Sequence, residues 1–349
     1  MNVFDYILTV GCTYERPKGG IAQLLYNYSY CIYNPFKFIA NSGSGNFVTK
    51  LIRTGKGVIL FLFRLLLDSS IRIVHIHTAS NNSFRRSAFY LRLSKCFHKK
   101  VVLHIHGGGF AEYYNVNQGY VAQILNKSDC IICLSEKWLD FFQKVSNCPI
   151  IRIVDNVVPE PVVEPVRISC KCHALFLGLL CPQKGIYDLL QVIIEHKDEF
   201  RDKFVLHIGG NGEVEEVKQI IFQEKLQDIV RLEGWVNGDK KVELLSQCHF
   251  YILPSYAEGL PMSILEAMSY QMPILSTPVG GIPEIVEDGV NGFLSVPGNH
   301  EALYKNIRTL IDNPSLVQEM GRQSYLRVKN HFAENVQKEL EKIYQELLK

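Results

Sequence analysis

The sequence predicts an α/β protein of two domains, each with a parallel sheet covered by helices. Three observations lead to this fold class. The chain has 349 residues, which is long for a single hydrophobic core. Apolar strand-like segments alternate with helical segments in two separate series, as in Rossmann-like parallel sheets. Between the series lies the stretch 158–165, whose three prolines cannot continue a helix or a central strand.

The first domain is expected to span residues 1–165. Short apolar runs rich in β-branched residues indicate strands, and apolar residues repeated every three to four positions indicate helices. The strands are expected at residues 3–10, 37–40, 71–77, 101–106, 130–134 and 150–154. The helices are expected at residues 21–31, 58–67, 83–97 and 136–145.

The second domain is expected to span residues 166–330 and repeats the same alternation. Its strands are expected at residues 174–178, 204–209, 230–232, 250–253 and 273–276. Its helices are expected at residues 186–196, 214–224, 261–269, 301–311 and 316–330. A last helix at 335–348 lies in the segment 331–349, which we expect to pack back on the first domain. Since ligands bind at the carboxyl ends of parallel strands, we expect the two domains to face each other across the active cleft.

The composition excludes several classes of protein. Hydrophobic residues make up 47% of the chain and charged residues 21%, so a large core is expected and disorder is not. The chain does not open with a basic segment and a cleavable apolar stretch, so we expect no secretory signal and a cytoplasmic protein. The most apolar run, 58–67, contains Arg64 and is shorter than the about 20 residues of a membrane span. We interpret it as a core-facing helix, with contact to a membrane surface as the second interpretation.

The ten cysteines are interpreted as free thiols of a reducing compartment. Cys130 and Cys133 have the spacing of a metal or redox pair, but they lie inside an apolar run and no second such pair exists. Cys170 and Cys172 are too close together for a zinc knuckle. Structural thiols explain both pairs better than a zinc site does.

The charge is unevenly distributed along the chain. Residues 1–165 carry 18 Lys and Arg against 10 Asp and Glu, a net +8, whereas residues 166–349 carry 19 against 25, a net −6. Six of the cations lie within 16 residues: Arg85, Arg86, Arg92, Lys95, Lys99 and Lys100. A basic first half suits an anionic partner such as a membrane surface or a phosphate-linked acceptor, and an ordinary solvated surface is the alternative. We expect no nucleic-acid partner.

The segment 258–266 carries most of the chemistry. An apolar strand and a loop precede it, and a helix opens with Pro261 at its first position. The backbone N–H groups of Gly259, Leu260 and Met262 at such a helix start suit a diphosphate. Glu258 lies in the loop at the mouth of the cleft, and Glu266 lies in the helix, where its carboxylate can accept hydrogen bonds from two vicinal hydroxyls. The alternative is that both are ordinary surface charges.

Residues 254–268 closely resemble the Glu-x7-Glu signature of glycosyltransferase family 4, whose members are retaining enzymes of the GT-B fold. Residues 277–294 resemble the segment that follows this signature, and there Gly280 and Gly281 let the backbone approach a ligand closely. Residues 176–190 resemble the family's first strand and loop of the second domain. This resemblance makes Lys184 a diphosphate-binding lysine.

The resemblance extends more weakly to the first domain. Gly19 and Gly20 match the family's glycine-rich loop beside the donor phosphates. Residues 101–110 resemble its His-Gly segment, which implies that His106 approaches the transferred sugar. The alternative reading of His106 with His75, His77 and His104 is a metal cluster, and we do not favour it because no carboxylate or cysteine ligand joins them. We expect the other three histidines in the core or in the cleft wall.

The sequence departs from the family at Leu179, where an arginine is usual. An arginine there would clamp the phosphates with charge-assisted hydrogen bonds. Arg16 or Lys18 is a candidate to compensate for its loss.

The glycines of 209–212 do not form a nicotinamide-binding fingerprint and match instead the family's second strand and loop. Trp235 falls where the family has its nucleobase wall, and stacking on the base and burial in the core both stay open.

The resemblance implies a hexosyltransferase that uses a nucleoside diphosphate sugar and no cofactor. Catalysis is assigned to His106, Glu258 and Lys184. No Asp-x-Asp occurs to hold a divalent metal, and backbone amides with Lys184 are expected to stabilise the leaving diphosphate instead. The acceptor is expected to be a saccharide, lipid-linked at the inner face of the cell membrane, in surface polysaccharide or glycolipid synthesis. The alternatives are a nucleotide-sugar 2-epimerase and an inactive GT-B scaffold, with a nicotinamide oxidoreductase third.

Overall fold

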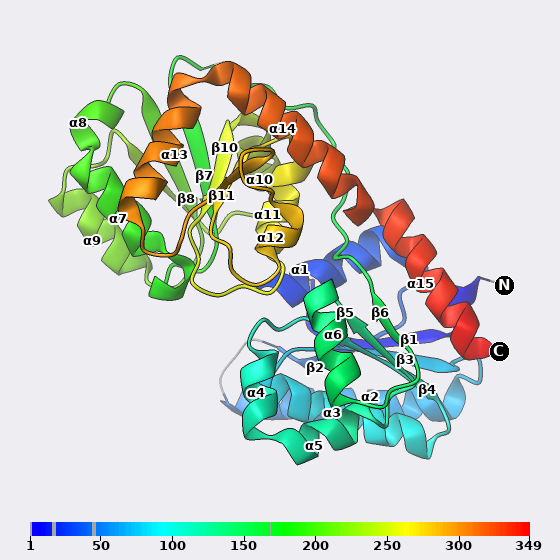
Figure 1. The fold of residues 1–349 in the computed structure, drawn as a ribbon. Coiled ribbons are helices and arrows are strands. Elements are labelled where there is room, and N and C mark those ends of the chain that lie inside the picture. The colour runs from blue at the N-terminus through cyan, green and yellow to red at the C-terminus, as the bar shows by residue number, and fades with distance from the viewer. Residues whose placement is uncertain (1, 16–18, 44–46, 168) are drawn as a thin grey trace. The chain divides into compact units, whose positions relative to one another are not determined.

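The chain forms two compact units in the computed structural model (Figure 1). The structure describes residues 2–15, 19–43, 47–167 and 169–349. The first unit comprises Met1–Pro159 and His331–Lys349, and the second comprises Glu160–Asn330. Residues 160–165, which the sequence assigns to the first domain, therefore belong to the second unit.

The first unit is built on one sheet of six parallel strands in the order β2-β1-β3-β4-β5-β6. These strands are β1 (Ile7–Cys12), β2 (Phe38–Ser42), β3 (Ile73–Thr78), β4 (Lys100–Ile105), β5 (Cys130–Cys133) and β6 (Ile151–Ile153). Every residue of β3 and β5, and all of β4 except Lys100, is buried. Burial on both faces is what helices on both sides of a parallel sheet produce, so the α/β prediction is confirmed for this unit.

Helices surround this sheet. They are α1 (Gly20–Asn27), α2 (Phe47–Leu67), α3 (Asn81–Cys96), α4 (Phe110–Val116), α5 (Gln118–Leu125), α6 (Glu136–Val145) and α15 (Ala333–Leu348). A π-helical turn, Tyr28–Ile32, continues α1. The sequence did not identify α4 and α5, because a short helix offers too few turns for a clear apolar repeat.

Helix α15 belongs to the first unit although it is last in the chain (Figure 1). Its buried side chains repeat every three to four positions, as on an amphipathic helix, and they are Val336, Leu340, Ile343, Tyr344 and Leu347. The hydroxyl of Tyr344 lies 2.6 Å from the Tyr33 hydroxyl and 2.6 Å from Nδ1 of His75. Both apolar packing and hydrogen bonds therefore hold α15 in this unit.

The prediction of one strand over 3–10 is wrong in its first half. Residues Val3–Tyr6 form a 3₁₀ turn, and β1 starts at Ile7. The Asn2 side chain accepts a hydrogen bond from the Phe4 amide, and the Asp5 carboxylate accepts one from the Asn2 amide. This reciprocal cap satisfies amides that a strand would leave free, so the local turn is favoured over extension.

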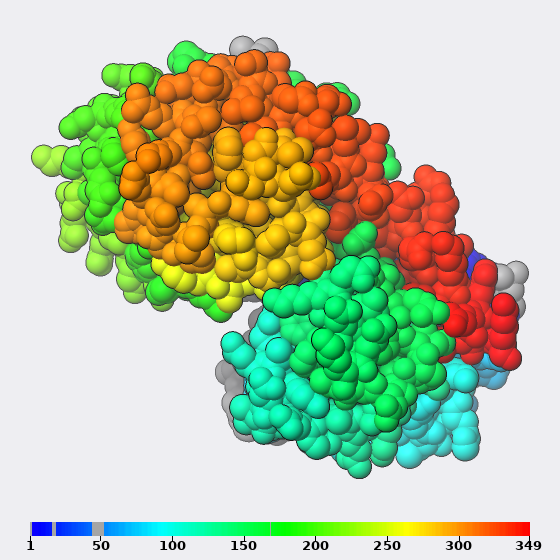
Figure 2. Space-filling view, in the orientation of Figure 1, coloured from blue at the N-terminus to red at the C-terminus, as the bar shows by residue number. Residues whose placement is uncertain are grey.

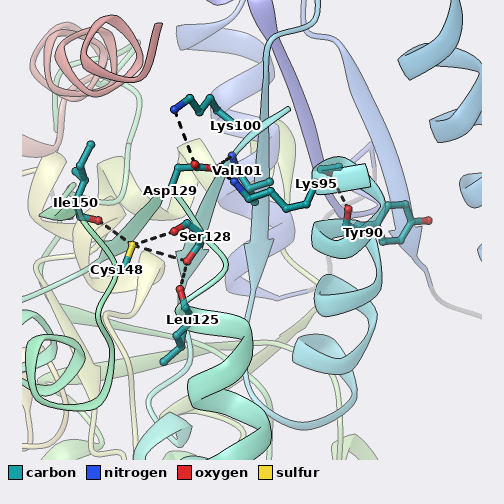
Figure 3. A network of polar contacts seen from close by, with 10 residues as sticks. Tyr90, Lys95, Lys100, Val101, Leu125, Ser128, Asp129, Cys148 and Ile150 are labelled. Atoms are coloured by element: carbon teal, nitrogen blue, oxygen red, sulfur yellow. Dashed lines mark hydrogen bonds and ion pairs between the residues drawn. The ribbon is translucent and has the colours of Figure 1, made fainter. Parts of the chain in front are cut away.

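Two lysines of the basic stretch 85–100 pair with Asp129, the residue that directly precedes β5. Figure 3 shows Lys95 and Lys100 beside Asp129, with N–O distances of 2.5 and 4.0 Å. The same carboxylate accepts a hydrogen bond of 2.7 Å from the Val101 amide at the start of β4. Part of the positive charge that the sequence analysis assigned to an anionic partner is therefore paired with a carboxylate of the protein itself.

The buried cysteines of the first unit pack as small apolar residues. The thiol of Cys148 lies 3.4 Å from the carbonyl oxygens of Ser128 and Ile150 (Figure 3). Cys130 and Cys133 are buried within β5. Burial raises the pKa of the Cys130 and Cys148 thiols, which disfavours the thiolate that a metal would need.

The second unit has its own sheet of six parallel strands, in the order β12-β11-β10-β7-β8-β9. They are β7 (Cys172–Leu177), β8 (Phe204–Gly209), β9 (Val230–Gly234), β10 (Phe250–Leu253), β11 (Ile274–Ser276) and β12 (Gly292–Leu294). The sequence missed β12, which has three residues at the sheet edge beside β11. A run that short carries no readable period.

The helices of the second unit are α7 (Ile186–Glu195), α8 (Lys197–Phe200), α9 (Val214–Gln223), α10 (Gly238–Gln247), α11 (Met262–Ser269), α12 (Ile282–Ile285), α13 (His300–Asp312) and α14 (Pro314–Val328). In Figure 2, α13 and α14 (orange) form one continuous surface with the golden segment around α12. A Cβ on Gly321 of α14 would lie 2.1 Å from the carbonyl oxygen of Gln271. Glycine thus permits the close packing of α14 against the end of α11.

Helix α2 is longer than the sequence suggested, because it begins at Phe47 rather than near residue 58. Its buried side includes Phe61, whose ring lies 4.9 Å from that of Tyr90 on α3. Within the described parts of the chain, no helix is long and apolar enough to cross a bilayer.

Candidate functional site

The loops that follow β7 and β10 meet where the strand order of the second sheet reverses. The chain runs from β7 outward to β9 on one side and then from β10 outward to β12 on the other. At such a switch point the two loops leave in opposite directions and open a ligand crevice. Lys184 ends the short turn after β7, and Glu258 lies in the loop after β10. Nζ of Lys184 is 2.5 Å from Oε1 of Glu258.

This ion pair is largely enclosed. The Glu258 side chain is 7% exposed and that of Lys184 is 23% exposed. The Ser255 hydroxyl donates to the same Oε1 at 2.8 Å. Both hydrogen bonds of the carboxylate therefore end on Oε1, and none from the described residues ends on Oε2. A ligand with hydroxyl groups and an anionic group can therefore bind Oε2 and compete for the ammonium of Lys184.

Two glycines after β11 bring a third loop against the first two. Gly280 has φ +58°, and a Cβ there would lie 2.1 Å from the carbonyl oxygen of Glu258. The amide of Gly281 donates to the Gly259 carbonyl at 2.7 Å. Gly280 therefore needs to be glycine for its positive φ. A Cβ at Gly280 or Gly281 would also come too close to the backbone of the loop after β10.

The start of α11 has the features of an anion site. The helix begins at Met262 with Pro261 as its N-cap, one residue later than the sequence predicts. No side chain caps this end, and its first turn holds no acidic residue. The first backbone amides of a helix have no partner within the helix and attract negative charge.

Glu266 is buried rather than on the surface, which rules out the surface alternative for this residue. It is 7% exposed overall, and its Oε1 lies 2.7 Å from Nζ of Lys241 on α10. Lys241 is a residue that sequence reasoning missed. Its helix has a largely exposed polar face, and nothing in the sequence indicates that α10 approaches α11.

The loop after β7 packs on the loop after β8. A Cβ on Gly210 would lie 1.9 Å from the Gly178 carbonyl oxygen, and the Leu180 amide donates to Asn211 at 2.6 Å. Leu179 lies between these contacts and is 47% exposed, so the loop presents an apolar side chain where the family has a guanidinium. The compensating residues suggested above, Arg16 and Lys18, lie outside the described residues.

A hydrogen-bonded group lies on β8 and β9 of the second sheet. His207 is 2.7 Å from Glu233, which also lies 3.5 Å from Lys240. Burial acts to raise the pKa of Glu233, but its interactions with His207 and Lys240 lower it overall. Trp235, two residues further, is 43% exposed, so the core alternative for this side chain is wrong.

In the first unit, the predicted glycines lie at the carboxyl end of β1. Gly19 is the N-cap of α1 with φ +119°, and Gly20 is the first helical residue. No side chain caps this helix start. No atom lies within 4 Å of a Cβ built on Gly19, so backbone conformation rather than space requires glycine there.

Four histidines form two hydrogen-bonded pairs across β3 and β4. Nε2 of His75 lies 3.3 Å from Nδ1 of His104, and Nδ1 of His77 lies 3.0 Å from Nε2 of His106. His75, His77 and His104 are buried, whereas His106 is partly exposed. Burial lowers the pKa of all four imidazoles, for His75 and His106 to about 3. They are therefore neutral at physiological pH.

The positions of these histidine rings also test the alternative that they bind a metal ion. Ring nitrogens of His75, His77 and His104 all lie within 4.8 Å of one another, and neutral imidazole is the form that binds metals. The rings of His75 and His77, however, stack face to face at 4.3 Å with an angle of 24° between their planes. Ring nitrogens bind metals in the ring plane, and stacked planes do not meet at one ion, so this arrangement does not suit a shared metal.

The predicted site residues thus divide between the units. Most of them lie in the second unit, in the loops after β7, β10 and β11 and in α11. These residues are Lys184, Glu258, Gly259, Leu260, Pro261, Met262, Glu266, Gly280 and Gly281. Gly19, Gly20 and His106 belong to the first unit. Within that unit they lie at the carboxyl ends of β1 and β4.

Comparison with known proteins decides what class of protein carries this site. Residues 171–327, which include the switch point, match the family described as glycosyl transferases group 1. Over most of its second unit the chain carries a group 1 glycosyltransferase domain. Among its relatives is an uncharacterised glycosyltransferase of Methanocaldococcus jannaschii, 28% identical over 250 residues, which are 70% of this chain and 68% of the relative. Another is the O-antigen chain mannosyltransferase B of Escherichia coli, 27% identical over 157 residues, 44% of this chain and 41% of the relative.

The fold of this glycosyltransferase agrees with a solved structure over almost its full length. The Anabaena protein HepE, solved in complex with UDP, is similar with a TM-score of 0.77 and 16% sequence identity. The similarity covers 97% of this chain and 99% of HepE. The predicted GT-B fold of the glycosyltransferase is confirmed.

Proposed function

We propose that this chain transfers a sugar, with retention of anomeric configuration, from a nucleoside diphosphate sugar to a saccharide acceptor. The observation that carries the proposal is the Lys184–Glu258 pair at the switch point of the second sheet, next to the uncapped start of α11 in the loop after β10. One cation beside a helix start that no side chain caps suits a diphosphate. The UDP bound to HepE supports this class of donor.

In the proposed reaction the bond between the anomeric carbon and the diphosphate oxygen breaks as negative charge grows on the diphosphate. Lys184, the first amides of α11 and the Gly280–Gly281 loop stabilise that charge. We propose that they do so without a divalent metal. The acceptor oxygen bonds to the anomeric carbon on the face that the diphosphate leaves, and its proton passes to a phosphate oxygen.

Glu258 is proposed to bind hydroxyls of the sugar and not to attack it. A retaining glycosidase needs two carboxyl groups about 5–5.5 Å apart, whereas the partners of Glu258 are an ammonium and a hydroxyl. Glu266 has one carboxylate oxygen on Lys241, and we propose that the group accepts hydrogen bonds from the ribose hydroxyls. The fixed position of Lys241 would orient it for this role.

The acceptor is proposed to be lipid-linked, in the synthesis of a surface polysaccharide or glycolipid at the inner face of the membrane. The net +8 of residues 1–165 favours a phosphate-linked acceptor. On α2, Phe63 and Leu67 are 56% and 79% exposed, and Arg64 between them is exposed too. An exposed face that is both apolar and basic suits an anionic lipid surface. The O-antigen mannosyltransferase among the relatives supports the polysaccharide context.

The test is a panel of nucleotide sugars, each incubated with the protein and EDTA and assayed for release of the nucleoside diphosphate. We expect release from one donor. Lys184→Ala should lower kcat/KM about 10- to 100-fold, the loss of a charge-assisted hydrogen bond, and Glu266→Ala should lower it as well. Lys305→Ala is the matched control, because Lys305 is 66% exposed and pairs with Glu301 within α13.

Other outcomes would identify the alternatives. Activity that is abolished by EDTA would contradict metal independence. An isomerised nucleotide sugar formed without acceptor would indicate an epimerase. Nucleotide binding without turnover, across lipid-linked and soluble acceptors, would support an inactive scaffold, for which the exposed Leu179 is the supporting observation. Leu179→Arg would then be the next variant.

A further inference from the structure

The hydrogen bond between His77 and His106 has the geometry of an in-plane imidazole pair. Nδ1 of His77 lies 3.0 Å from Nε2 of His106. The ring planes differ by 6°, with centroids 5.2 Å apart, so the nitrogens face each other edge to edge. His77 pairs with His104 in the register of β3 and β4. His106, two residues beyond, therefore points to the same face of the sheet.

Counting protons shows which nitrogen donates. A neutral imidazole carries one N–H and one lone pair, so one ring must donate to the other. Nε2 of His77 is buried and has no hydrogen-bond partner in the described part of the chain. An orphaned N–H is rarer in folded proteins than an under-satisfied acceptor. The buried Nε2 of His77 is therefore assigned as the unprotonated nitrogen, and the proton of His77 lies on Nδ1.

We propose that His77 is a positioning residue that fixes His106 as the tautomer protonated on Nδ1. Nε2 of His106 accepts the hydrogen bond from His77, so the proton of His106 lies on its other nitrogen. Nδ1 of His106 has no partner among the described residues, and it presents an N–H donor. This inference rests on the proposed function, together with the expectation from the family resemblance that His106 approaches the transferred sugar.

The consequence concerns the chemistry open to His106. With Nε2 engaged and Nδ1 protonated, the ring has no free lone pair and cannot act as a general base. It can donate a hydrogen bond to a sugar oxygen, and its orientation is held by the His77 ring. Burial keeps both rings neutral, so the donor is a neutral imidazole rather than a cation. The group that His106 recognises is then an acceptor oxygen on the sugar.

The tautomer is read directly by NMR on protein labelled with ¹⁵N-histidine and free of substrate, since protonated and unprotonated ring nitrogens have well-separated shifts. His106 is assigned by its loss in His106→Gln. We expect the wild type to show Nδ1 protonated. His77→Leu should remove this preference. His77→Asn should restore it, because the asparagine amide offers an N–H donor near the position of Nδ1.

The control is His75→Leu. It removes a buried imidazole from the same strand, but it breaks the His75–His104 pair and not the His77–His106 pair. It should leave the His106 signals unchanged, whereas a merely structural role of His77 predicts the same disturbance in both variants. A wild-type His106 protonated on Nε2 would overturn the proposal. So would a His106 tautomer that His77→Leu does not alter.

Kinetics give the second readout, with the donor found in the nucleotide-release panel. His77→Leu should lower kcat about tenfold, the factor that corresponds to one neutral hydrogen bond, with little change in the donor KM, because the phosphate contacts are untouched. His77→Asn should recover most of the loss. If the wild type turns over no donor, the proposed function fails, while the NMR still decides the tautomer.

Discussion

Single residues at the switch point of the second sheet hold the candidate site in shape. Gly280 and Gly185 have φ of +58° and +69°, and each lies where a Cβ would meet the backbone of the loop after β10, at Glu258 or Pro254. These contacts keep three loops together around Lys184 and Glu258. The shape of the site therefore depends on residues that themselves have no side chain.

Gly280→Ala should destabilise the protein and abolish transfer, because the methyl group would lie 2.1 Å from the Glu258 carbonyl oxygen. Gly289→Ala is the matched control. Its φ of +77° imposes a similar backbone cost, but no atom lies within 4 Å of its Cβ. We expect about 1–2 kcal/mol for the control and clearly more for Gly280→Ala, measured by urea denaturation. Equal losses in the two variants would mean that the loop contact contributes nothing.

At the scale of elements, α2 is the helix with the most exposed apolar surface in the described structure. Its exposed aliphatic and aromatic residues are Ile52, Ile59, Leu60, Phe63, Leu66 and Leu67. Positions 47–67 include four Lys or Arg and no Asp or Glu. A helix of a soluble protein usually places such residues in the core, so an exposed apolar face of this kind indicates a binding surface. An anionic lipid surface would match both the positive charge and the apolar character of this face.

Phe63→Ser should weaken binding to vesicles that contain anionic lipid by about tenfold, since insertion of a phenylalanine contributes about 1.5–3 kcal/mol. The control is Phe222→Ser on α9, because Phe222 is also well exposed, at 74%, but lies in the second unit. Co-sedimentation at physiological salt measures both. The membrane proposal fails if the wild type does not bind, or if both substitutions weaken binding equally.

At the scale of the whole molecule, histidines couple stability to pH. His75, His77 and His104 are fully enclosed, and burial lowers the pKa of each. In the unfolded chain the same imidazoles take up protons near pH 6.5. As the pH falls below that value, the unfolded state binds more protons than the folded state. The free energy of unfolding therefore decreases from pH 6.5 toward the folded pKa, about 3 for His75.

Urea denaturation between pH 5 and 8 should show this loss below pH 6.5, with about 1.4 kcal/mol per pH unit for each imidazole that stays neutral. Above pH 7 these groups contribute no slope. His104→Phe should reduce the slope between pH 5 and 6 by about 1.4 kcal/mol per pH unit, whatever its effect on stability at pH 8. A slope that is flat from pH 5 to 7 in the wild type would contradict neutral buried histidines.

The sequence by itself determined the two α/β series, most strand positions and the segment 258–266. These features rest on local information, namely the apolar period of each element and a motif contiguous in the chain. Helix α6 and strands β8 and β10 begin and end where the apolar pattern predicts. Lys184 and Glu258 were found in the same way, each from its own local segment.

Only the tertiary structure decided which side chains meet. Lys184 and Glu258 are 74 residues apart and form a pair because β7 and β10 are neighbours in the sheet. Lys241 reaches Glu266 because α10 and α11 approach each other, and the histidine pairs follow from the register of β3 against β4. Strand order and register arise from the packing of distant elements, and no local apolar period encodes them.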